Sequence, residues 1–80
     1  MARIIDGNQM NMVGDRIKEL RIAKKMSQQT LSNKLEMLAI YICRGSISRI
    51  EEKLRTVTDI ELYGLAQVLG VSIQDLFETD

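Results

Sequence analysis

A chain of 80 residues with no proline and only three aromatic side chains is long enough for one small domain, whose core must be largely aliphatic. The lack of histidine and the single cysteine, Cys43, exclude a disulfide within the chain, a cysteine-based zinc site and the commonest general base, so no enzyme, metal or cofactor is expected. The net charge is zero, but it is unevenly distributed. Residues 1–55 hold all eleven basic residues and six acidic ones (+5), and residues 56–80 hold five acidic residues and no basic one (−5). The basic segment, residues 1–55, is therefore suited to binding a polyanion. No membrane-spanning run or signal-peptide pattern occurs, so a cytoplasmic protein without a membrane partner is expected. The chain is also too small to hide a substrate pocket of ordinary size, so no small-molecule substrate is expected.

Residues 1–12 have no sustained periodicity and are predicted to form a flexible N-terminal arm, in which Ile4 and Ile5 could pack on another surface. Residues 13–80 are predicted to form one domain. Either Asn11 or Asp15 would serve the start of its first helix.

The first two helices are predicted from apolar residues at helical spacing. The first ends near Lys24 and Lys25, cations that suit a helix C-terminus, and the second begins after Ser27, a strong N-cap residue. The core positions of the first helix are Val13, Ile17 and Leu20, and those of the second are Leu31, Leu35 and Leu38.

An extended connector, A-I-Y-I, is predicted to follow the second helix, with Ile40 and Ile42 as inward anchors. The third helix begins at C-R-G-S, and its core face is Ile47 and Ile50, with Leu54 one turn later.

The segment from Thr58 to Glu61 has the spacing of a capping box and predicts the start of a fourth helix, after which Gly70 takes a positive φ. The apolar positions of this helix are Ile60, Leu62, Leu65, Ala66 and Leu69. Ser72 then caps a short fifth helix that ends near Phe77. Five short helices in this length predict an all-α, five-helix orthogonal bundle.

Three segments in a fixed order resemble the phage-repressor helix-turn-helix family, also called Cro-like or xenobiotic-response-element (XRE) proteins. They read RIKELRIAKKMSQQTLSNKL, ISRIE and VTDIELYGLAQVLGVSIQDLF, and the likeness extends from Val13 to Phe77. The resemblance implies a lambda-repressor-like DNA-binding domain and a sequence-specific transcriptional regulator. Its partners would be double-stranded DNA with a palindromic operator and a second copy of the chain in a homodimer, and it would repress by occupying the operator.

The resemblance also assigns site residues, because in such a motif the second helix crosses the DNA backbone and the third enters the major groove. Base contacts are expected from Arg44, Gly45, Ser46 and Arg49. Phosphate contacts are expected from Gln28, Gln29, Lys34, Ser48, Lys53 and Arg55, with solubilising surface charge as the alternative for the two lysines and Arg55. An internal ion pair between Arg21 and Glu51 is expected to tie the first helix to the third.

The sequence departs from the family pattern between the second and third helices. Leu35 and Ile47 are twelve positions apart, where most members have seven, so the second helix is expected to gain about one turn. Ala39 and Lys53 replace glycines at helix ends, where a left-handed φ would cost about 1–2 kcal/mol. Cys43 stands at the cap of the third helix, either as a tolerated small residue or as a redox sensor with a lowered pKa.

A competing hypothesis is a protein-interaction module, such as an antitoxin-like or regulatory partner protein. Its acidic C-terminal half would dock another protein, with Leu76 and Phe77 in the interface. The zero net charge favours this alternative.

Overall fold

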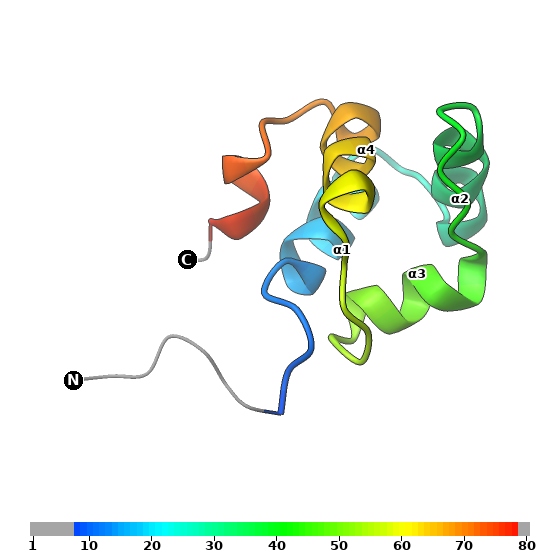
Figure 1. Ribbon diagram of the computed structural model, residues 1–80. Helices are drawn as coiled ribbons and strands as arrows, with labels where there is room; N and C mark the ends of the chain where they lie inside the picture. The colour runs from blue at the N-terminus through cyan, green and yellow to red at the C-terminus, as the bar shows by residue number, and fades with distance from the viewer. Residues whose placement is uncertain (1–7, 79–80) are drawn as a thin grey trace.

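A computed structural model describes residues 8–78, which contain four α-helices and one 3-10 turn (Figure 1). The helices are α1 (Gly14–Ala23), α2 (Gln28–Glu36), α3 (Arg44–Glu51) and α4 (Asp59–Leu69), and the 3-10 turn is η1 (Gln74–Phe77). The fold is therefore all-α within residues 8–78, but the predicted fifth helix is only this four-residue turn. No helix in that part of the chain is long and apolar enough to cross a bilayer.

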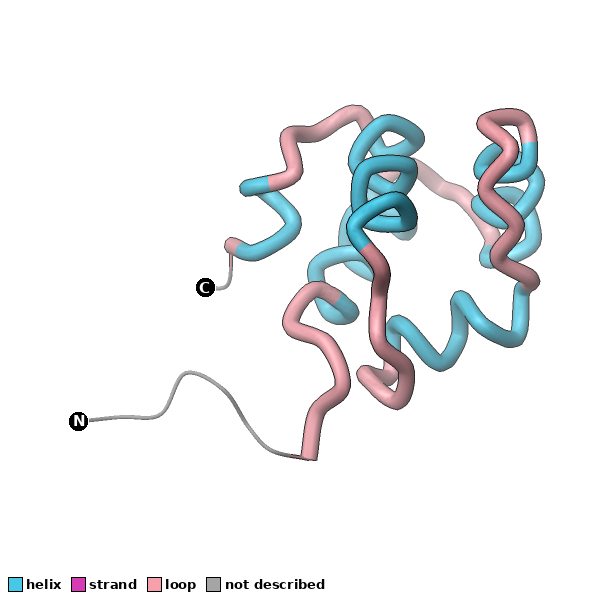
Figure 2. The backbone as a smooth tube through the Cα atoms, viewed as in Figure 1, coloured by secondary structure: helices cyan, strands magenta, loops and turns pink. Residues whose placement is uncertain are grey.

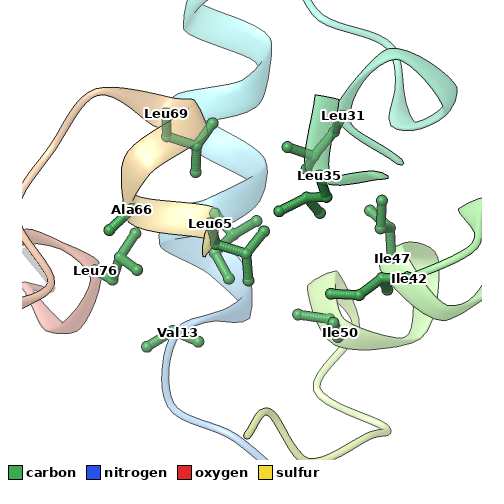
Figure 3. Close-up of a cluster of buried hydrophobic side chains, with 11 residues drawn as sticks. Val13, Leu31, Leu35, Ile42, Ile47, Ile50, Leu65, Ala66, Leu69 and Leu76 are labelled. Carbon is green, nitrogen blue, oxygen red and sulfur yellow. The ribbon is translucent and has the colours of Figure 1, made fainter. Parts of the chain in front are cut away.

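Helices α1 and α4 pack together in the middle of the domain, with α2 and α3 on one side and η1 on the other (Figure 2). Every element and the connector contribute to a single core (Figure 3). Its buried apolar residues are Val13, Ile17, Leu31, Leu35, Ile42, Ile47, Ile50, Leu65, Ala66, Leu69 and Leu76. The core thus fixes α3 from its inner side and leaves its outer side to solvent.

Three apolar residues that periodicity assigned to the core are exposed instead. Leu38 and Leu54 lie beyond the ends of α2 and α3, and Ile60 faces outward from the first turn of α4. Leu76, by contrast, is fully buried, which removes it from the interface expected for a protein-interaction module and leaves only Phe77 exposed.

Each of the four helices is followed, one to three residues after its last residue, by a residue with left-handed φ. The N–H of the residue after that one donates to the carbonyl five positions before itself. The left-handed residues are Lys25 (φ 57°), Ala39 (61°), Lys53 (63°) and Gly70 (71°). At the end of α2, Ile40 N donates to Leu35 O at 3.0 Å. The prediction that α2 gains a turn is therefore wrong, and the five additional residues lie in the connector.

Replacing Ala39 by glycine is expected to stabilise the domain by about 0.5–1 kcal/mol. Removing Cβ relieves about 1–2 kcal/mol of left-handed strain, part of which is offset by the larger conformational entropy of unfolded glycine. The matched control is Ala23→Gly, at an exposed helical position, which should instead destabilise the domain by about 0.5–1 kcal/mol. Thermal unfolding followed by circular dichroism measures both, and a lower melting temperature for both variants would contradict the left-handed assignment of Ala39.

The start of α1 is held by Asn11 rather than Asp15. Asn11 Oδ1 accepts from Val13 N (3.1 Å) and Gly14 N (2.8 Å), while its amide donates to Ile50 O (3.0 Å) and Arg55 O (2.8 Å). Met10 N also donates to Lys53 O at 3.0 Å. The arm predicted for residues 1–12 is therefore bonded to the domain at its C-terminal end, and the prediction for Ile4 and Ile5 lies outside the described residues.

Candidate nucleic-acid interface

The outer face of α3 presents the residues expected to contact bases. Arg44, Gly45 and Arg49 are exposed, and Ser46 is half-buried. Neither arginine side chain forms a hydrogen bond or ion pair with any other residue among 8–78, so both guanidinium groups are available to a ligand. A Cβ added at Gly45 would meet nothing within 4 Å, which leaves open space beside the helix start.

Cys43 occupies the N-cap position of α3 with an extended backbone, but its side chain makes no capping hydrogen bond. Its Sγ lies 3.4 Å from Ser46 Oγ and is exposed. The Ser46 hydroxyl, together with backbone N–H groups at the helix start, stabilises the thiolate and lowers the pKa of Cys43.

The inner side of α3 carries a buried ion pair. Arg21 on α1 donates from Nε to Glu51 Oε2 (2.6 Å) and from Nη2 to Glu51 Oε1 (3.0 Å), and only 2% of the Glu51 side chain is exposed. The hydrogen bonds to Glu51 raise the pKa of Arg21 above its usual value. The third arm of the guanidinium, Nη1, donates to Met26 O at 2.8 Å. Helix α3 is thus attached by its last turn to α1 and to the turn that leads into α2.

Gln28 joins the same carboxylate, because its Nε2 donates to Glu51 Oε1 at 3.1 Å. The sequence assigned Gln28 to phosphate contact; in the structure the residue is half-buried and one N–H of its amide bonds within the domain. One carboxylate therefore connects α1, α2 and α3.

Two further residues assigned to phosphate contact form ion pairs within the domain. Lys53 Nζ lies 2.6 Å from Asp15 Oδ2. Arg55 is bidentate to Glu61, at 2.9 and 2.8 Å, and this lowers the pKa of Glu61. Glu61 also completes the predicted capping box with Thr58. The charges of Lys53 and Arg55 are neutralised locally, which disfavours the phosphate contact expected for them.

The other residues assigned to phosphate contact remain accessible. Gln29 and Lys34 are exposed on α2, and Ser48 is half-buried on α3. The Gln29 amide donates to Asn33 Oδ1 at 3.0 Å, an exposed bond that does not bury either side chain.

Two residues that position this face were missed by the sequence analysis. The Ser32 hydroxyl, buried on the inner side of α2, donates to Ile42 O at 2.7 Å and fastens the connector just before α3. A Cβ at Gly14 would overlap the Ile50 carbonyl oxygen, so α1 approaches the end of α3 at a distance that only glycine allows. The available signals were a serine beside two core leucines and a glycine within the first helical period.

Comparison with protein-family models matches residues 17–76 to the model described as helix-turn-helix. The chain belongs to the XRE-like helix-turn-helix family, whose members are DNA-binding transcriptional regulators. None of the curated proteins compared with the chain matches it.

Three solved structures show the same fold. The restriction-modification controller protein C.AhdI from Aeromonas hydrophila is 31% identical, with a TM-score of 0.72 over 81% of this chain and 87% of that one. The biofilm regulator SinR, solved in complex with DNA, is also 31% identical, with a TM-score of 0.72 over 84% of this chain and 100% of its own. The DNA-binding domain of BldD is 20% identical, with a TM-score of 0.71 over 92% of this chain and 100% of its own, and supports the fold alone.

Proposed function

We propose that this helix-turn-helix protein binds a palindromic operator in double-stranded DNA as a homodimer and represses transcription by occupying it. The observation that carries the proposal is the pair of unpartnered guanidinium groups, Arg44 and Arg49, on the outer face of a helix whose inner face is fixed by a buried ion pair. The likeness to SinR, solved in complex with DNA, supports double-stranded DNA as the partner.

The proposed base contacts come from α3. An arginine can donate two hydrogen bonds to guanine in the major groove, and a serine hydroxyl can reach a base of either kind. Arg44, Ser46 and Arg49 take these roles, while Gly45 lets the DNA approach the helix backbone closely. Gln29, Lys34 and Ser48 are the proposed phosphate contacts. In a dimer, two α3 helices would enter major grooves about 34 Å apart on one side of the duplex.

Selection of binding sites from a randomised duplex library tests this function. The expected product is a palindromic consensus with half-sites about 10 base pairs apart. Fluorescence anisotropy on the selected duplex should show an affinity that falls steeply with salt, because phosphate neutralisation releases counterions. If no duplex binds better than random DNA at low salt, the protein is not a sequence-specific DNA-binding protein.

A further inference from the structure

A groove lies between α2 and the connector, residues 37–43, next to the start of α3. Its volume is about 450 Å³. The residues that line it are Gln29, Ser32, Asn33 and Glu36 of α2, Tyr41, Ile42 and Cys43 of the connector, and Arg44 and Ser46 of α3. The groove therefore adjoins both the proposed phosphate contact of α2 and the proposed base contacts of α3.

Tyr41 is held out from the domain by the residues on either side of it. Ile40 packs against the core, and Ile42 is buried. The bond from the Ser32 hydroxyl to Ile42 O fastens the backbone at this point. Tyr41 itself is 77% exposed, the second most exposed large apolar side chain among residues 8–78. The backbone that carries this aromatic side chain is anchored, so binding through it orders only the side-chain torsions.

The chemistry around Tyr41 suits an anionic oxygen at the α3 end of the groove. Arg44 is cationic there, and Gln29 and Asn33 are neutral amides. The one acidic lining residue, Glu36, stands in the last turn of α2, about 10 Å along the helix from Gln29. Tyrosine hydroxyl groups are regular donors to DNA phosphates.

We propose that Tyr41 is a further DNA contact, whose hydroxyl donates a hydrogen bond to a backbone phosphate at the edge of the major groove. The lengthened connector would then hold the DNA strand against α2. This inference rests on the proposed function, because it needs Gln29 on the phosphates and Arg44 on the bases at either side of Tyr41.

Such a contact leaves a distinct signature. A phosphate contact positions the protein without reading sequence, so its loss weakens binding to the operator and to mismatched operators by the same factor. The phenol is uncharged, so its loss leaves the salt dependence of affinity unchanged. Loss of Arg44 should instead change both sequence preference and salt dependence.

The test compares Tyr41→Phe with Tyr63→Phe, which removes the same hydroxyl from an exposed site on α4. Anisotropy is measured on the selected operator and on a single-mismatch version, at two salt concentrations. Tyr41→Phe should bind both duplexes about three- to tenfold more weakly, with an unchanged salt slope and thermal melt. Tyr63→Phe should bind as the wild type does.

The inference is overturned if Tyr41→Phe stays within about twofold of the wild type, whether or not Tyr41→Ala is weaker, since a weaker alanine variant would indicate stacking instead. It is also overturned if Tyr41→Phe loses affinity only for the matched operator, which would indicate a base contact. Failure of the proposed function is recognised separately, because the wild-type protein would then bind no duplex specifically.

Discussion

The Arg44→Ala, Arg49→Ala double variant is expected to bind the selected operator between about 30-fold and 10⁴-fold more weakly than the wild type. Each bidentate arginine–guanine contact contributes about 1–3 kcal/mol of discrimination, and the variant loses both. Both side chains are exposed and unpartnered within residues 8–78, so the thermal melt should change by no more than a surface substitution does. Anisotropy and circular dichroism measure the two quantities.

The control for this experiment removes the same charge from another face. The Lys18→Ala, Lys24→Ala variant takes two exposed cations from α1 and the turn after it. It should lose only the modest affinity that general charge attraction supplies. Equal weakening of the two double variants would mean that α3 contributes charge but no recognition.

Replacing Glu51 by glutamine is expected to lower the free energy of unfolding by about 3–5 kcal/mol. The variant leaves the guanidinium of Arg21 buried without its counter-charge. Removing one partner of a buried ion pair is strongly destabilising, because the remaining charge is uncompensated. Urea denaturation followed by circular dichroism measures the change. A loss of this size is a large part of the stability of a small domain.

The matched control is Asp15→Asn, which breaks the ion pair between Lys53 and Asp15. That pair is exposed on its acidic side, so its loss should cost no more than about 1 kcal/mol. If both variants cost no more than about 1 kcal/mol, the buried pair does not stabilise the attachment of α3. If both variants lower the free energy of unfolding by about 3–5 kcal/mol, the exposed pair between Lys53 and Asp15 stabilises the domain more than expected.

Local patterns predicted the parts of the fold that depend on few neighbouring residues. The capping box of Thr58 and Glu61 acts within four positions, and the inward face of α3 at Ile47 and Ile50 follows from helical spacing. The end of α2 was mispredicted because it depends on left-handed φ at Ala39, which alanine adopts only under tertiary constraint. The exposed Leu38 follows from the same error.

The sequence predicted correctly that Arg44 and Arg49 are exposed on α3, and their contact with bases stays a prediction. The candidate site was not predictable where a side chain had a partner far away in the sequence. Gln28 bonds to a carboxylate 23 positions away, and Lys53 pairs with one 38 positions away. Residue type and local charge favoured a DNA contact for both residues. Their partners, Glu51 and Asp15, come into contact with them only in the folded chain, so the sequence did not indicate these bonds.

The shared carboxylate of Glu51 has a mechanical consequence for DNA binding. Because α1 and the first turn of α2 donate hydrogen bonds to one buried carboxylate in the last turn of α3, the relative positions of these three elements are restrained. The spacing between the proposed phosphate contacts on α2 and the proposed base contacts on α3 is then set before any duplex arrives. A duplex whose groove width differs from that spacing has to bend or twist to fit, and the cost depends on how stiff its sequence is. The protein would therefore discriminate among DNA sequences by their flexibility as well as by their base edges.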